Sequence, residues 1–178
     1  GSAVTLGSAL IMPASSTLNV SQGSLQLASQ VLSAGGDVNI GNNAEILVNA
    51  SAQLLMQGSN LLNVNSGGKL SALGSSGQPA LISRSGAFYY GLNVYSGGTI
   101  AAEHAIFEYM DYAGVNINSG AIVDPIHSFT DCTFQSGSYG GTLLSVNNEQ
   151  FISITDAVFP SNTWFGMGNV SKNANSGS

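Results

Sequence analysis

The chain has 178 residues, of which 43% are hydrophobic and only 7% are charged, and its net charge is −6 with three basic residues. Three basic side chains are too few to neutralise a phosphate backbone, so this composition argues against nucleic-acid binding. No apolar run reaches the roughly 18 residues of a membrane span, and we expect no membrane insertion. Low charge with many apolar residues predicts a chain that folds, since disordered chains show the reverse pattern.

The first half of the chain consists of short aliphatic segments separated by Gly, Ser, Asn or Ala. They predict strands at 4–6, 10–12, 18–20, 25–27, 38–40, 45–48 and 53–56, because apolar and small polar residues alternate within them. Residues 1–87 contain no Phe, Tyr or Trp, and every aromatic residue lies from Phe88 onward. We therefore predict one domain, 1–178, with an aliphatic part (3–87), an aromatic-rich part (88–165) and a flexible tail (166–178). Both ends stop in mid-pattern, so we expect a fragment of a longer protein.

A triplet of an apolar residue, an asparagine and an apolar residue returns along the chain, each time followed by small residues. The asparagines are Asn19, Asn39, Asn63, Asn93 and Asn116. Their spacing falls in the range typical of stacked repeat units. We predict an all-β fold, a single-stranded right-handed parallel β-helix of about eight coils. The apolar residues of each triplet would point inward, and the asparagines would stack outside as an amide ladder.

A second repeat appears in the later part of the chain, where residues 127–134 align with 152–159 at an offset of 25, and less well with 104–109. Its pattern of apolar, polar, Asn or Asp, Cys or Ala, polar and Phe resembles the coil repeat of right-handed parallel β-helices of the pectin-lyase-like superfamily. It is most similar to the Gly/Ser/Asn-rich β-helices of bacterial secreted and cell-surface proteins. The resemblance covers residues 15–160. It implies the fold and a secreted or cell-surface localisation, but not one activity, because the superfamily includes lyases, hydrolases, adhesins and stalks.

This alignment places Glu108, Asp131 and Asp156 in one acidic column, with carboxyl groups about 5 Å apart along the stack. Such a column would suit a Ca²⁺ ion or a glycosidase-like carboxylate pair. We favour the alternative that each carboxylate binds backbone N–H groups at its own turn. The same alignment stacks His104 on His127, but no spaced Cys or His completes a metal site. We therefore predict no metal centre and no cofactor, with Ca²⁺ as the one candidate.

Tyrosines are concentrated just after the compositional step at residue 88. The first five of them are Tyr89, Tyr90, Tyr95, Tyr109 and Tyr112. Because tyrosine has a flat apolar face and a polar tip, they are candidates for a carbohydrate-binding platform. The alternative is that the tyrosines cover the edges of a core filled by phenylalanines. The single cysteine, Cys132, is expected to be a small buried hydrophobic residue.

The resemblance also implies what a catalytic relative would need. Lyases of the superfamily use Arg or Lys as a base beside Ca²⁺-binding carboxylates, whereas residues 85–171 contain no Lys or Arg. The paired Asp and Gly-His-Gly element of its polygalacturonase-type hydrolases are missing too. We therefore assign no catalytic residue and predict a non-catalytic module of a secreted or surface-exposed bacterial protein, a rigid spacer or an adhesin. Its partners would be polysaccharide or a host or neighbouring cell surface.

The alternative prediction is a polysaccharide-active lyase or hydrolase, or a carbohydrate-binding β-helix. The acids available to such an enzyme are Glu103, Glu108, Asp111, Asp124 and Asp131.

Overall fold

The computed structural model describes residues 1–160 and 168–173, and all regular secondary structure in these residues is β-strand. Most strands are short, because turns of small residues interrupt the apolar segments. The strands are β1 (Ala3–Thr5), β2 (Leu10–Ile11), β3 (Leu18–Val20), β4 (Gly23–Gln26), β5 (Val31–Ala34), β6 (Val38–Ile40), β7 (Ala44–Val48), β8 (Gln53–Met56), β9 (Leu61–Val64), β10 (Lys69–Leu73), β11 (Ala80–Arg84), β12 (Tyr90–Val94), β13 (Thr99–Glu103), β14 (Ala105–Glu108), β15 (Met110–Ile117), β16 (Ile122–Thr130), β17 (Thr133–Gln135), β18 (Thr142–Val146) and β19 (Gly168–Lys172).

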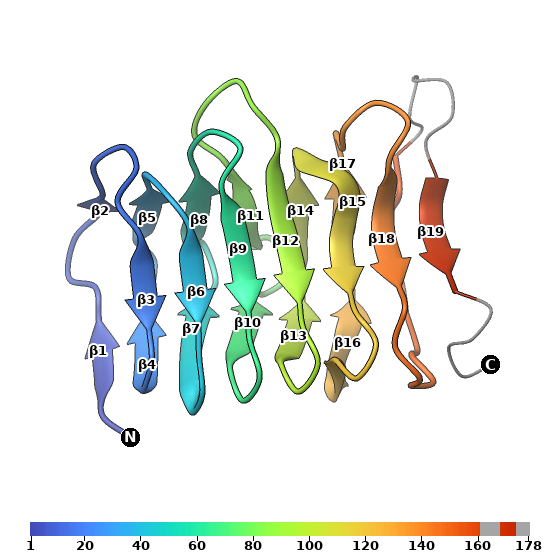
Figure 1. Ribbon diagram of the computed structural model, residues 1–178, viewed down its shortest axis with the longest axis horizontal. Helices are drawn as coiled ribbons and strands as arrows, with labels where there is room; N and C mark the ends of the chain where they lie inside the picture. The colour runs from blue at the N-terminus through green and yellow to red at the C-terminus, as the bar shows by residue number, and fades with distance from the viewer. Residues whose placement is uncertain (161–167, 174–178) are drawn as a thin grey trace.

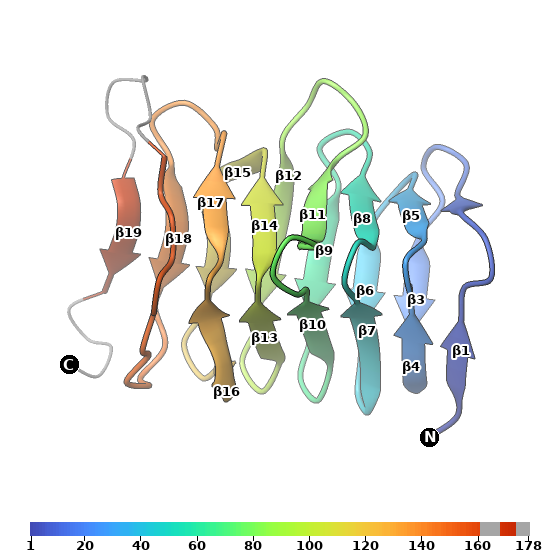
Figure 2. The same cartoon turned by 180° about the vertical axis from the view of Figure 1, so that it is seen from behind.

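From β1 to β18 every third strand joins the same sheet, so each of the first six turns contributes one strand to each of three parallel sheets. Sheet A contains β1, β4, β7, β10, β13 and β16; sheet B contains β2, β5, β8, β11, β14 and β17; sheet C contains β3, β6, β9, β12, β15, β18 and β19. The described residues therefore form a parallel β-solenoid (Figures 1 and 2). In Figure 1 the chain rises through sheets A and B at the back and descends through sheet C at the front while advancing to the right, which is a right-handed path.

The solenoid has about seven turns, one fewer than the predicted eight, because several turns are longer than the average that the prediction assumed. Ala3 pairs with Ser24, whereas Lys69 pairs with Thr99, so the turn that begins at Lys69 contains more residues than the first turn. Part of the segment predicted to be a flexible tail is also ordered: Gly168–Lys172 forms β19, which pairs with β18. Asn173 follows β19, and residues 166–167 and 174–178 lie outside the described residues.

The five asparagines of the repeated triplet lie in register on neighbouring strands of sheet C. Asn19 pairs with Asn39, Asn39 with Asn63, Asn63 with Asn93, and Asn93 with Asn116. The side-chain amide of Asn39 donates to Asn19 Oδ1 and that of Asn63 donates to Asn39 Oδ1, both at 3.0 Å, and the amide of Asn116 donates to Asn93 Oδ1 at 3.1 Å. Each of these amides thus bonds to the preceding turn.

The ladder is interrupted between the third and fourth turns, a feature that the repeat pattern did not predict. Asn63 Oδ1 is buried and has no hydrogen-bond partner, although Asn93 is its register neighbour. Beyond Asn93 the ladder resumes and extends by one residue, because Asn147 donates to Asn116 Oδ1 at 3.2 Å. The outer face of sheet C therefore carries two separate runs of side-chain amides.

The core changes character along the axis as the composition suggests. In the first turns it consists of aliphatic residues such as Leu62 and Val64, which flank Asn63 and are fully buried. In the fifth and sixth turns Phe134 is the centre of the core, and its ring stacks on Phe107 at 5.2 Å and on Phe159 at 5.1 Å between ring centroids. Phe129 meets Phe134 edge-on at 5.6 Å. Aromatic pairs at these separations add stability beyond the area that they bury.

Candidate functional site

The predicted acidic column of Glu108, Asp131 and Asp156 does not form. Phe107 pairs with Phe134, so Glu108 lies beside Gln135 and not beside Asp131. The alignment failed because β16 contains a bulge. Thr99 pairs with Ile122 near the start of the strand, but Glu103 pairs with Thr130 at its end, so β16 uses more residues than β13 over the same distance. The difference in residue number between paired residues of the two turns therefore changes partway along the strand.

Asp131 and Asp156 do lie at equivalent positions of successive turns. The parallel bridge between Thr133 and Val158 has the same offset of 25 residues that aligned these two aspartates in the sequence. Both residues, like His104, have a left-handed backbone, with φ of 52° for Asp131, 54° for Asp156 and 47° for His104. Aspartate tolerates this conformation better than most residues, because its short side chain can bond to the local backbone.

The two histidines pair with carboxylates rather than with each other. His104 Nδ1 lies 3.6 Å from Asp131 Oδ2, and His127 Nδ1 lies 2.6 Å from Glu103 Oε2. Each pair joins the fifth turn to the sixth. The predicted stacking of His104 on His127 is wrong for the same reason as the acidic column, because the bulge in β16 displaces His127 toward Glu103.

Asp124 lies within this bulge and binds the backbone that forms it. Its carboxylate accepts hydrogen bonds from the N–H groups of Ile126 at 3.0 Å and His127 at 3.3 Å, and Lys69 Nζ lies 3.0 Å away. Desolvation alone would raise the pKa of Asp124, but the hydrogen bonds from Lys69 and the two backbone groups outweigh it and lower the pKa. This carboxylate acts as a turn residue, although the alternative of backbone-bound carboxylates was predicted for the column acids and not for Asp124. At Glu108 that alternative is wrong, because the donors to its carboxylate are the side chains of Ser83 and Gln135.

The described residues contain no group of three or more His, Cys, Asp or Glu side chains that could hold a metal ion. Cys132 is buried, and burial raises the pKa of its thiol to about 12. A thiol that stays protonated is a poor nucleophile and a poor metal ligand. No helix in the described residues has the length and hydropathy of a membrane span.

The five tyrosines proposed as a platform do not share one surface. Tyr90 is fully buried, and its hydroxyl donates to the carbonyl of Ile82 at 3.2 Å, so the prediction for Tyr90 is wrong. Burial and the neighbouring carboxylates raise the pKa of that hydroxyl. Tyr95 follows β12, at the connection to sheet A, whereas Tyr89 precedes β12. These two tyrosines therefore lie at opposite ends of the same strand.

The other tyrosines gather where the chain passes from sheet B to sheet C, which we call the B–C corner. In the fourth, fifth and sixth turns this corner consists of residues 85–89, residues 108–112 at the end of β14 and the start of β15, and residues 136–141. In Figure 1 the connection from β11 to β12 and the connection from β17 to β18 rise at the upper edge, and the shorter connection from β14 to β15 lies between them. The backbone links them, since Tyr90 N donates to Tyr109 O at 3.3 Å and Tyr109 N donates to Gln135 O at 3.4 Å.

Arg84 orders the aromatic rings at the B–C corner. Its guanidinium lies over the ring of Tyr109 at 4.0 Å and over that of Tyr89 at 5.1 Å, and Nη1 donates to the carbonyl of Ala87 at 2.6 Å. Cation–π contacts of this kind hold planar groups in a fixed stack. Arg84 is not among the residues predicted from the sequence, although a lone basic residue close to Phe88, Tyr89 and Tyr90 was an available signal.

Polar groups accompany the rings at the B–C corner. Glu108 accepts hydrogen bonds from Ser83 Oγ at 2.8 Å and from Gln135 Nε2 at 2.9 Å, which lie on the preceding and following turns. Asp111 accepts from the N–H of Ala113 at 2.9 Å, and its half-buried position raises its pKa despite that bond. Arrays of fixed carboxylates and amides beside aromatic rings can bind hydroxyl-rich molecules.

Asp111 and Tyr112 lie in a bulge of β15. Tyr90 pairs with Met110 but Leu92 pairs with Val115, so extra residues are inserted between the two pairs. Gly114 closes the bulge with φ of 66°, and a Cβ atom there would meet the carbonyl oxygen of Thr142 at 2.2 Å. Only glycine fits this position. Bulges commonly redirect side chains at binding sites.

A separate hollow of about 210 Å³ lies where sheet A passes to sheet B and is lined by His104, Asp131 and the connection between β10 and β11. Ser75 and Gln78 close this connection with two backbone hydrogen bonds of 3.0 and 2.9 Å. Figure 2 shows it projecting from the solenoid.

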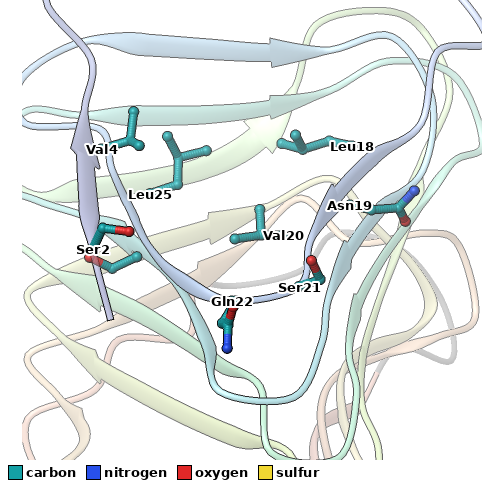
Figure 3. Close-up of a pocket in the computed structure, with 9 residues that line it drawn as sticks. Ser2, Val4, Leu18, Asn19, Val20, Ser21, Gln22 and Leu25 are labelled. Atoms are coloured by element: carbon teal, nitrogen blue, oxygen red, sulfur yellow. The ribbon is translucent and has the colours of Figure 1, made fainter.

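The N-terminal end of the solenoid is open. β1, β2 and β3 are the terminal strands of their sheets, and a hollow of about 300 Å³ lies within the first turn. Figure 3 shows the side chains of Val4, Leu18, Val20 and Leu25 pointing into it, while Asn19 points away. Residues 1–36 contain no Asp, Glu, Lys, Arg or His, so these three strands carry no charged side chain.

Comparison with known proteins adds little to this description. No family model matches the chain, and no curated protein matches it. Among solved structures, it is similar to a crystal structure of the TibC-catalyzed hyper-glycosylated TibA55-350 fragment. The sequence identity is 16%, the match covers 98% of this chain and 72% of that chain, and the TM-score is 0.21. Values this low support no inference about function, so the fold rests on the chain's own sheet topology.

Proposed function

We propose that the chain is a non-catalytic module of a secreted or surface-exposed bacterial protein, of the pectin-lyase-like β-helical kind, and that it acts as a rigid spacer or adhesin. The observation that carries the proposal is the continuity of three parallel sheets along the axis, each strand paired in register with the turn before it. Seven turns at about 4.8 Å each make a stack roughly 30 Å long.

Two features support a rigid and chemically inert body. Bending the stack would break backbone hydrogen bonds in all three sheets and would separate the side-chain amides of the ladder in sheet C. The carboxylates considered for catalysis are also engaged in fixed contacts, as Asp124 is with Lys69 and Glu103 is with His127. Such contacts fit a structural role for these acids.

The decisive test is incubation with a panel of plant and bacterial polysaccharides, followed by assays for new reducing ends and for unsaturated uronate products. We expect neither product at any concentration of the protein. For the adhesive role, beads coated with the protein should be retained on polysaccharide-coated surfaces more strongly than beads coated with an inert protein. Release of either product would reject a non-catalytic module.

The second candidate, a polysaccharide-active enzyme, is favoured by one observation. His104 and Asp131 form a His–carboxylate pair beside the hollow of about 210 Å³. A carboxylate can orient an imidazole for general-base catalysis. If the panel reveals cleavage, Asp131→Asn should reduce its rate strongly, whereas an unchanged rate would remove this pair from the mechanism.

A further inference from the structure

We propose that the B–C corner of the fourth to sixth turns is a binding site for a neutral polysaccharide chain, an inference that rests on the adhesive form of the proposed function. The site consists of exposed aromatic side chains above a layer of fixed polar groups. Its exposed aromatic members are Phe88, Tyr89, Tyr112 and Tyr139, and the partly buried Tyr109 supports them beneath Arg84.

Three of the aromatic side chains are largely exposed to solvent. Phe88 is 65% exposed, Tyr112 69% and Tyr139 65%, although most large apolar residues of these turns are buried in the core. They come from three successive turns, whose paired strands are stacked about 4.8 Å apart along the axis. A polymer of repeating rings lying along the axis can contact several of them at once, whereas a single small molecule cannot.

The platform is organised before any ligand arrives. Arg84 is held between Tyr109 and Tyr89 and by the carbonyl of Ala87, so the two rings do not need to be ordered on binding. The bulge closed by Gly114 fixes the backbone that carries Tyr112. Preorganisation of this kind increases affinity, because less conformational entropy is lost in the complex.

Polar groups beside the rings suit sugar hydroxyls. Glu108 uses its two oxygens to accept from Ser83 and Gln135, and each oxygen keeps a lone pair for a further donor. Asp111 adds a second carboxylate in the bulge. Hydroxyl groups can donate to these oxygens while the apolar faces of the sugar rings lie on the aromatic side chains.

The charge at the corner selects neutral polymers over acidic ones. Glu108 and Asp111 would repel a polyuronate, and the guanidinium of Arg84 already faces two aromatic rings. A protein partner fits less well, because the cores of protein interfaces are depleted of charged residues. Here Glu108 and Asp111 directly precede Tyr109 and Tyr112 in the chain.

The test is native affinity electrophoresis in gels that contain hydroxyethyl cellulose, galactomannan, xylan or polygalacturonate. The wild-type protein should be retarded by at least one of the three neutral polymers and less by polygalacturonate. Phe88→Ala with Tyr112→Ala should weaken that retardation about tenfold or more, since each exposed ring contributes on the order of 1 kcal/mol. Tyr95→Ala, which removes an exposed tyrosine from the opposite end of β12, is the matched control and should leave it unchanged.

Several results would overturn the inference. They are no retardation by any neutral polymer, stronger retardation by polygalacturonate, and equal effects of the double variant and the Tyr95 control. Dimerisation through the corner that the double variant abolishes, without retardation in any gel, would identify a protein interface instead. None of these results bears on the cleavage assay, so the site can fail while the proposed non-catalytic function stands.

Discussion

The amide ladder in sheet C permits a prediction in which neighbouring asparagines behave differently. Asn39 donates to Asn19 and accepts from Asn63, so it takes part in two side-chain hydrogen bonds. Asn19 takes part in only one of these bonds and is exposed at the end of the ladder. Asn63 also takes part in one, and its Oδ1 is buried without a partner.

Net hydrogen-bond energies turn this difference into expected changes in the free energy of unfolding. A typical intramolecular hydrogen bond contributes about 1 kcal/mol, and a buried polar atom without a partner costs about 1–3 kcal/mol. Asn39→Ala should therefore destabilise the solenoid by about 2 kcal/mol and Asn19→Ala by about 1 kcal/mol at most. Asn63→Ala loses one bond but also removes the unpaired oxygen, so its net effect should be close to zero.

Urea denaturation of the three variants measures these differences, and hydrogen exchange of the backbone amides in β6 and β9 localises them. Exchange data are needed because a stacked repeat can unfold turn by turn. The expected order of destabilisation is Asn39→Ala, then Asn19→Ala, then Asn63→Ala. If Asn63→Ala proves as damaging as Asn39→Ala, or if Asn39→Ala is as stable as the wild type, the ladder does not stabilise the stack as argued.

Four further predictions concern other parts of the molecule. Phe134→Ala should lower the free energy of unfolding by about 3–5 kcal/mol and Phe134→Leu by clearly less, since leucine refills much of the cavity; equal urea midpoints would contradict the aromatic core. Cys132, whose thiol pKa burial raises to about 12, should react with a thiol reagent at pH 8 only after denaturation, and rapid labelling of the native protein would contradict its burial. The lowered pKa of Asp124 means that its bridge to Lys69 stabilises the fold above the ordinary carboxyl pKa and is lost as pH falls through the lowered value. Asp124→Asn should therefore cost up to about 1 kcal/mol at pH 7 and progressively less in acid, as followed by thermal melts, and a difference independent of pH would refute this. Ile11→Lys in β2 should change the free energy of unfolding by no more than about 0.5 kcal/mol in urea denaturation, because the Ile11 side chain is largely exposed, and a larger loss would contradict that exposure.

Local patterns in the sequence were sufficient to predict the architecture. The spacing of Asn19, Asn39 and Asn63 identified positions that pair in register, because identical triplets can bury their apolar residues only by stacking face on face. The change in core composition at residue 88 was likewise visible in advance, since only the later turns contain aromatic residues that could fill the interior.

The sequence did not reveal which residues meet on the surface. Whether Tyr89 or Tyr90 points outward depends on where β12 begins, because side chains alternate between the two faces of a strand. Arg84 also contacts Tyr109, which lies on the next turn of the solenoid, and no local sequence motif indicates this contact.

Repetition by itself determined that this chain stacks into parallel sheets around an apolar core, because the apolar period is encoded residue by residue. The partners of Glu108, Asp131 and His127 were decided only by the tertiary structure. Bulges in β15 and β16 insert residues without breaking the core, so the offset between facing residues changes within a single turn. The stacking of Phe107 on Phe134 and the continuous backbone ladder favour the observed register over the alignment of similar side chains.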